Sequence, residues 1–241
     1  IQLKSGGPAI LALTTGESMT EVHRYDRRST DVFTLNDGES FVSTPAGFRF
    51  AKLIALGTPQ GILDVEPLVV QHIRYPIKPA GEFRCSDLLL DRIWETCAHT
   101  LHLCMQNELW DAIKRDQLPW MGELATEALA TYHVFGEAGL VRRSLAVLAE
   151  LGPAPARPLE KQIYPGLQAV WKSPDGELNG IPSYTLWWVI GLADYVRYTG
   201  DRSLLVDYTP ELLAGLRHIA RHVGSDAFWH LRRNRNAQRC T

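Results

Sequence analysis

The spacing of apolar residues along this chain changes near Ser86, and this change restricts what the chain can fold into. Before that point, short apolar runs such as 32–35 alternate with turn signals such as Asn36-Asp37-Gly38. Glycine, asparagine and aspartate favour tight turns, and alternation with a period of two is typical of half-buried strands. We therefore expect antiparallel β structure over residues 1 to about 75, with residues 61–77 continuing the β-rich run.

After Ser86 the apolar residues recur at helical spacing, as in Leu89, Ile93 and Cys97. Ser86 is a plausible N-cap, and Gly152-Pro153 is a typical helix end. Pro210 is acceptable at the first position of a helix. Five helices are predicted, over about 86–109, 123–135, 140–151, 184–198 and 209–223.

The helical part contains a loose internal repeat. Residues 130–152 and 193–224 share one plan, in which an apolar helix ends in aromatic residues, a turn with glycine and an acid follows, and a second apolar helix returns. Repeated pairs of this kind indicate stacked or toroidal αα-hairpins. The fold class predicted is therefore mixed, with the end of an antiparallel β-sandwich followed by α-hairpins.

Composition excludes several function classes. The 241 residues carry a formal net charge of −2 and have no basic run, which argues against nucleic-acid and membrane-surface partners. No stretch approaches the roughly 18 consecutive apolar residues of a membrane span. The first residues do not have the pattern of a signal peptide, so a cytoplasmic location is favoured.

The cysteines and histidines show no metal or redox motif. Cys85, Cys97, Cys104 and Cys240 form no C-x-x-C pair, and we expect buried free thiols. His218 and His222 have the spacing of a helical metal pair but lack the intervening glutamate of a metalloprotease motif, which favours a solvated helix face. His99 and His102 are interpreted as structural. Neither a metal nor a cofactor is predicted.

The segment LWDAIKRDQLPWMGE, residues 109–123, carries three carboxylates, Asp111, Asp116 and Glu123. We expect Pro119 to Gly122 to form a turn that lets the three converge, which one straight helix would not allow. Closely spaced acids raise one another's proton affinity, and a nearby indole removes water from them. Such acids are suited to glycoside cleavage, in which one protonates the leaving group and another activates water or attacks the sugar.

Tryptophans accompany the acids. Trp120 can stack on the apolar face of a sugar ring, and Trp171, expected in a loop, is a candidate for a substrate wall. Of the adjacent Trp187 and Trp188, one is expected in the core. The alternative interpretation of 109–123 is a solvated surface on which the acids pair with Lys114 and Arg115.

The same segment resembles the signature of bacterial α-L-rhamnosidases of glycoside hydrolase family 78. The residues that carry the resemblance are Asp111, Arg115, Asp116, Leu118, Trp120, Gly122 and Glu123. The resemblance implies that Asp116 is the general acid, that Asp111 and Glu123 hold the rhamnose hydroxyls, and that Trp120 lines the sugar subsite. Many family members have Glu at the position of Asp116 and Asp at that of Glu123. Arg115 and Trp171 complete the set of candidate binding residues.

The likeness extends over residues 40 to 223. Residues 44–57 resemble the last strands of the β-sandwich that precedes the catalytic domain, and residues 181–201 resemble a later barrel helix. The resemblance implies an (α/α)₆ barrel, which needs twelve helices. The domains expected are a β-sandwich segment with its linker over 1–80, and the N-terminal part of a six-hairpin domain over 81–241.

Three functions are compatible with these observations. The first is an inverting glycosidase that releases terminal α-L-rhamnose, of which this chain is a fragment without the general base and with little activity of its own. The second is another glycosidase or a lyase on the same toroid, and the third is a non-catalytic carbohydrate-binding or structural module. The partner expected is a rhamnose-containing glycoside, and exposed apolar faces of an incomplete toroid would favour self-association.

Overall fold

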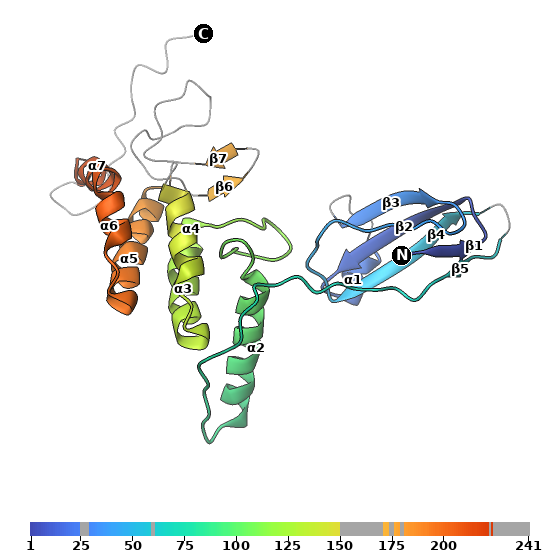
Figure 1. Cartoon of the computed structure of the whole chain (residues 1–241), viewed down its shortest axis with the longest axis horizontal. Coiled ribbons are helices and arrows are strands. Elements are labelled where there is room, and N and C mark those ends of the chain that lie inside the picture. Colours follow the sequence, from blue (N-terminus) through green and yellow to red (C-terminus); the bar gives the residue numbers. More distant parts are fainter. Residues whose placement is uncertain are drawn as a thin grey trace, which may run out of the picture. The chain divides into compact units, whose positions relative to one another are not determined.

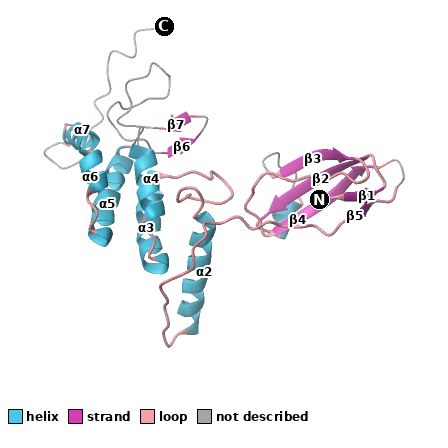
Figure 2. Cartoon of the chain, in the orientation of Figure 1, coloured by secondary structure: helices cyan, strands magenta, loops and turns pink. Residues whose placement is uncertain are grey.

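The computed structural model of the chain separates into two compact units (Figure 1). The first consists of Ile1–Ile73 with Ile113–Arg115, and the second of Arg74–Ala112 with Asp116–Thr241. The strands β1 to β5 belong to the first unit and the longer helices to the second (Figure 2). The structure describes residues 1–24, 29–58, 61–149, 171–173, 176–178, 181–221 and 223.

The first unit is built on a three-stranded antiparallel sheet. Its strands are β2 (Ala9–Gly16), β3 (Thr30–Leu35) and β4 (Phe50–Gly57), in the order β3-β2-β4. The central strand β2 is almost entirely buried, since it pairs on both sides, with Leu11 opposite Phe33 and Ala55. Two pairing partners and an apolar sequence explain why β2 forms the centre of the sheet.

A smaller pair of strands lies in the same unit. β1 (Leu3–Ser5) pairs with β5 (Asp64–Val65), and the short helix α1 (Met19–Val22) follows β2. The core of the unit is the buried set Leu3, Ala9, Leu11 and Leu35. The prediction of antiparallel β structure in this part of the chain is therefore confirmed.

The expected continuation of β structure over 61–77 is wrong. Of these residues, all of which are described, only Asp64–Val65 form a strand. Val69 and Val70 are exposed at 80% and 67%, so the apolar run has no sheet to pack on. Pro67 and Pro76 each lack an amide donor, which is incompatible with an interior strand.

The second unit begins with three long helices, α2 (Leu88–Cys104), α3 (Met121–Phe135) and α4 (Gly139–Ala149). They agree with the predicted helices within a few residues. The N-cap of α2 is Asp87 rather than Ser86, because its carboxylate accepts the Leu89 amide at 2.8 Å. The helix α3 begins at Met121, so Gly122 lies inside the helix and not in the expected turn.

The later helices are α5 (Pro182–Thr199), α6 (Ser203–Asp207) and α7 (Thr209–Ala220). The helix α6 was not predicted, because five residues are too few to show a period. Both α3 and α5 end at a glycine with positive φ, Gly136 at 63° and Gly200 at 74°, a backbone conformation that glycine adopts without strain. The short hairpin β6 (Trp171–Ser173) and β7 (Gly176–Leu178) precedes α5.

Helices α3 and α5 lie side by side and form the centre of the helical core (Figure 1). The core includes Met121, Leu124, Leu145, Trp188 and Leu192, all nearly inaccessible. Of the two adjacent tryptophans, Trp188 is completely buried and Trp187 is 41% exposed. The chain is thus of mixed class, with small antiparallel sheets and several helices.

The first half of α2 is not covered by the described residues. Leu89 and Ile93, which the helical pattern assigned to a buried face, are 60% and 48% exposed. The expectation of buried thiols is wrong for Cys97, which is exposed in the middle of α2. It is also wrong for Cys85, which is exposed and precedes the helix. Cys104 is buried as predicted, and Cys240 lies outside the described residues.

Candidate carbohydrate site

The N-terminal end of α3 carries the first carboxylate of the candidate site. Glu123 lies in the first turn of α3, and its carboxylate accepts hydrogen bonds from the hydroxyl of Tyr184, at 3.3 Å to Oε1 and 3.1 Å to Oε2. Tyr184 belongs to the first turn of α5, and sequence reasoning did not identify it. A carboxylate near the positive end of a helix dipole is electrostatically favoured. The contact between α3 and α5 therefore fixes a negative charge at this end of the helices.

Gly122 permits this arrangement, since a β-carbon at this position would lie 2.6 Å from Cζ of Tyr184. We expect Gly122→Ala to displace the Tyr184 ring from Glu123. Burial and the nearby Glu123 raise the pKa of Tyr184, so displacement should bring its titration towards the ordinary value. The measurement is ¹³Cζ-tyrosine NMR of the chain, with the signal assigned by Tyr184→Phe.

The matched control for this prediction is Gly215→Ala in α7, where a β-carbon would lie 3.0 Å from a methyl group of Thr185 and would not reach Tyr184. This variant should leave the Tyr184 titration unchanged. An unchanged titration in Gly122→Ala would show that the close packing of glycine against the ring does not position the tyrosine.

The Trp120 indole lies beside the same tyrosine. Trp120 is the N-cap residue of α3, and its ring is edge-on to that of Tyr184, with the centroids 6.3 Å apart and an interplanar angle of 79°. The side chain is half-buried. An aromatic ring that is fixed on one side and accessible on another can provide a platform for the apolar face of a sugar.

Hydrogen bonds of the backbone at Leu109 and Asp111 fix the segment that carries the Asp111 side chain. The amide of Leu109 donates to Oγ of Ser144 on α4 at 2.9 Å in a buried setting, and the amide of Asp111 donates to the carbonyl of Leu118 at 3.0 Å. The hydrogen bond between Asp111 and Leu118 joins the two ends of the loop over residues 111–118. The position of Asp111 therefore depends on α4 as well as on the loop.

The carboxyl of Asp111 is partly buried and lies near other negatively charged groups. Its Oδ1 is buried and has no hydrogen-bond partner among the described residues. Burial raises the pKa of Asp111, the negative charges of Asp116 and, less strongly, Glu123 raise it further, and the amides of Leu118 and Ala112 oppose the change. The charges of Asp116 and Glu123 both act on Asp111, so the structure brings the three carboxyls into one region.

Asp116 is half-buried and is followed by the only described non-glycine residue with positive φ, Gln117 at 56°. Such a conformation costs energy for most side chains and is frequent at functional sites. The chain turns over residues 113–116 and bends at Leu118, whereas Met121 and Gly122 of the predicted 119–122 turn belong to α3. Arg115 is exposed and belongs to the first unit, and the structure does not place it relative to the carboxylates.

Glu127 is the carboxylate that sequence reasoning missed. It lies four residues after Glu123, one turn further along α3, and its Oε2 is buried without a hydrogen-bond partner among the described residues. Burial raises the pKa of Glu127 to about 8, with contributions from the charges of Asp111 and Glu123. The i, i+4 spacing was visible in the sequence, but the loss of water was not.

The last predicted residue, Trp171, lies in β6 opposite Leu178 rather than in an irregular loop. Its side chain is outside the described part of the structure, and its expected role as a substrate wall stays a prediction. His102 is buried, as a structural residue should be, and its Nε2 lies 2.9 Å from the carbonyl of Tyr75. His99 is exposed, His218 is half-buried and His222 is outside the described residues.

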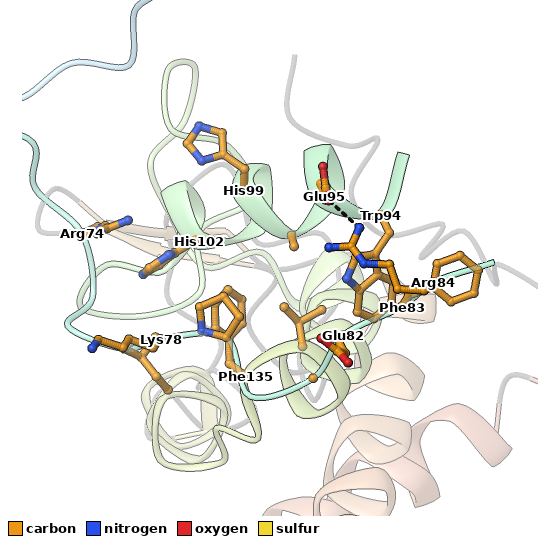
Figure 3. Close-up of a pocket in the computed structure, with 15 residues that line it drawn as sticks. Arg74, Lys78, Glu82, Phe83, Arg84, Trp94, Glu95, His99, His102 and Phe135 are labelled. Atoms are coloured by element: carbon orange, nitrogen blue, oxygen red, sulfur yellow. Dashed lines mark hydrogen bonds and ion pairs between the residues drawn. The ribbon is translucent and has the colours of Figure 1, made fainter. Parts of the chain in front are cut away.

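A cavity of about 390 Å³ lies elsewhere, at the opposite end of α3 (Figure 3). Its wall includes Trp94, Phe135 and the ion pair of Arg84 with Glu95, at 2.8 Å. Twelve residues of helix separate Glu123 from Phe135, which at about 1.5 Å per residue is about 18 Å. The candidate site is the carboxylate cluster at the start of α3, and this cavity lies near the other end of the helix.

Two further searches of the described residues gave negative results. No group of three or more His, Cys, Asp or Glu side chains there has the arrangement of a metal site. No helix in the part of the chain that was searched is long and apolar enough to cross a membrane.

The chain matches one known protein family over most of its helical part. Residues 78–237 match the family described as the bacterial alpha-L-rhamnosidase 6 hairpin glycosidase domain. No curated protein matches the chain at a significant level.

Solved structures are similar over 95% of the chain. A family GH78 rhamnosidase of Bacillus sp. GL1 is 26% identical with a TM-score of 0.72, and the chain covers 24% of it. A rhamnosidase from Klebsiella oxytoca with rhamnose bound is 21% identical (TM-score 0.67, 48% covered), and an alpha-L-rhamnosidase from Dictyoglumus thermophilum is 19% identical (0.67, 26% covered). The last two show the fold alone. The chain thus spans about a quarter to a half of the length of these proteins.

Proposed function

Because this chain belongs to the bacterial α-L-rhamnosidase six-hairpin glycosidase family, we propose that it supplies the acid-bearing part of an enzyme that hydrolyses terminal α-L-rhamnosides. The observation that carries this proposal is the convergence of Asp111, Asp116 and Glu123 beside Trp120 and Tyr184 at the start of α3 and α5. The family match to a bacterial alpha-L-rhamnosidase domain and the likeness to the Bacillus rhamnosidase support the choice of sugar.

In this proposal Asp116 protonates the glycosidic oxygen as the bond to the sugar breaks. Asp111 and Glu123 accept hydrogen bonds from the sugar hydroxyls, since ionised carboxylates act only as acceptors. Trp120 lines the subsite with its ring. Arg115 and Trp171 stay proposed as further binding residues, on the family resemblance and the sequence alone.

The complete reaction needs a second carboxylate. We assign the inverting mechanism, in which a general base activates water on the far side of the sugar, about 6.5–9.5 Å from the acid. The base is proposed to come from sequence outside these 241 residues, since the relatives are two to four times longer than the part covered. The chain alone should then turn over little substrate.

The domain organisation proposed with this function follows the family resemblance. Residues 1–80 are the end of a β-sandwich and a linker, and residues 81–241 are the N-terminal part of an (α/α)₆ barrel. The exposed Leu89 and Ile93 of α2 would be covered in a closed barrel and would favour self-association in its absence.

The experiment that tests the function is release of p-nitrophenol from the α-L-rhamnoside by the chain and by a version extended through the downstream coding sequence. We expect hydrolysis by the extended protein. An extended protein that hydrolyses another pyranoside, but not the rhamnoside, would favour a different glycosidase on the same fold. No hydrolysis of any of them would favour a binding module.

Binding of rhamnose by the chain itself, followed by NMR titration, locates the subsite. Glu123→Gln should weaken binding by about 10-fold to 100-fold, because hydrogen bonds to a charged group contribute about 1.5–3 kcal/mol. The matched control is Glu95→Gln in the cavity at the other end of α3, which should not change the affinity. The reverse result would move the sugar site to that cavity.

A further inference from the structure

The carboxyl of Glu127 lies where an ionised carboxylate would lack a hydrogen-bond donor among the described residues. Its Oε2 is closed off from solvent, and the described residues offer it no hydrogen-bond donor. The residue lies inside α3, whose neighbouring positions Leu124 and Ala128 are buried in the helical core. A charged carboxylate there would lose its hydration without a compensating bond, which is strongly unfavourable.

The carboxyl of Asp111 is in a similar environment. Its Oδ1 is also buried and also lacks a donor among the described residues. After burial, the negative charge of Asp111 is the largest contribution to the raised pKa of Glu127. A proton on Glu127 removes its charge, and a neutral carboxyl is buried at a lower cost than an ionised one.

The distribution of charge indicates which carboxyl holds the proton. Glu127 faces the negative charges of Asp111, from the loop after α2, and of Glu123, from α3 itself. Asp111 receives hydrogen bonds from the amides of Leu118 and Ala112, which favour its ionised form. From α5, the Tyr184 hydroxyl is bonded to Glu123. Glu127, with its pKa raised to about 8, therefore keeps its proton at neutral pH.

We propose that Glu127 is a positioning residue of the sugar site: its carboxyl, whose Oε2 is buried without a hydrogen-bond partner among the described residues, holds Asp111 and the first turns of α3 in the arrangement that binds the sugar. Because its Oε2 is closed off from solvent, we expect Glu127 to act through Asp111 rather than by contact with the sugar. The part of this inference that concerns sugar binding rests on the proposed function. The part that concerns the proton does not.

Direct titration of the carboxyl tests the proton. In ¹³Cδ-glutamate NMR of the chain, with the signal assigned by Glu127→Gln, Glu127 should titrate near pH 8. Asp111→Asn should lower the midpoint by about one unit, since it removes a neighbouring charge. Asp116→Asn is the matched control and should leave it in place. A midpoint below about 6, or one that Asp111→Asn does not lower, would overturn the proposal.

Stability gives a second measurement that needs no ligand. A carboxyl whose folded pKa is raised binds its proton more tightly in the folded state, so stability falls as pH rises from the unfolded value towards the folded one and is constant above it. For Glu127 this interval runs from 4.5 to about 8. The urea midpoint of Glu127→Gln should therefore exceed that of the wild type by an increasing amount between pH 5 and pH 8. A difference that is constant with pH would indicate a purely structural role.

Sugar binding tests the functional part. The rhamnose affinity of the wild type should fall about tenfold between pH 7 and pH 9.5, as Glu127 ionises, and that of Glu127→Gln should not. Equal pH dependence in both proteins would contradict the positioning role. If neither protein binds rhamnose at any pH, the proposed function fails, and the carboxyl titration still decides whether Glu127 holds the proton.

Discussion

Replacement of Trp188 by alanine should destabilise the helical unit by about 3–5 kcal/mol, the range found when a large buried aromatic is truncated. Trp188 is completely buried on α5. Its Nε1 donates to the carbonyl of Leu145 on α4 at 3.4 Å, and its ring is edge-on to Tyr208 with centroids 6.4 Å apart. The variant thus leaves a cavity where three helical segments meet.

Urea unfolding followed by circular dichroism at 222 nm measures this loss, because the helices dominate that signal. The neighbouring Trp187, 41% exposed, is the matched control, and Trp187→Ala should change the free energy of unfolding by less than about 1 kcal/mol. Equal effects of the two variants would mean that α5 is rotated about its axis relative to the arrangement described.

Replacement of Asp116 by asparagine should lower kcat of a rhamnoside-hydrolysing version of this protein by about 10²–10⁴-fold, the usual contribution of a general acid. Asparagine has nearly the same shape but has no carboxyl proton to donate. Because binding through Asp111 and Glu123 remains, KM should change little. Loss of binding with unchanged kcat would instead make Asp116 a binding residue.

The leaving group makes this prediction specific for proton donation. Nitrophenolate departs readily without a proton, whereas an alkoxide does not, so Asp116→Asn should reduce hydrolysis of an alkyl rhamnoside more than that of p-nitrophenyl rhamnoside. Asp207, exposed at the end of α6, provides the control variant Asp207→Asn, which should leave both rates unchanged. Equal losses for the two substrates would exclude Asp116 as the acid.

Much of the helical architecture was predictable because its determinants are local. Apolar spacing and a proline in the first turn, as at Pro210, are properties of neighbouring residues, and the predicted helix bounds agree with α3, α5 and α7 within a few residues. The same reasoning failed for 66–77, where apolar residues suggested strands. Whether such a run becomes a strand depends on a partner strand, which the local pattern does not contain.

The candidate site divides in the same way. The sequence alone identified Asp111, Asp116 and Glu123, since their density in one short segment beside Trp120 was unusual. It did not identify Tyr184, because the hydrogen bond to Glu123 joins residues 61 positions apart. The position of Gly122 was also misjudged, since only the packing of the Tyr184 ring explains a glycine inside α3.

By itself, then, the sequence determined where regular structure begins and ends and which residues could carry acid chemistry, because those properties arise from short-range preferences. Only the tertiary structure decided that Trp188 rather than Trp187 is buried, that Cys97 is exposed, and that Oε2 of Glu127 is buried, which raises the pKa of its carboxyl. The burial of a side chain and the charges around it depend on residues that the fold brings together from distant parts of the chain. The local sequence pattern does not contain this information.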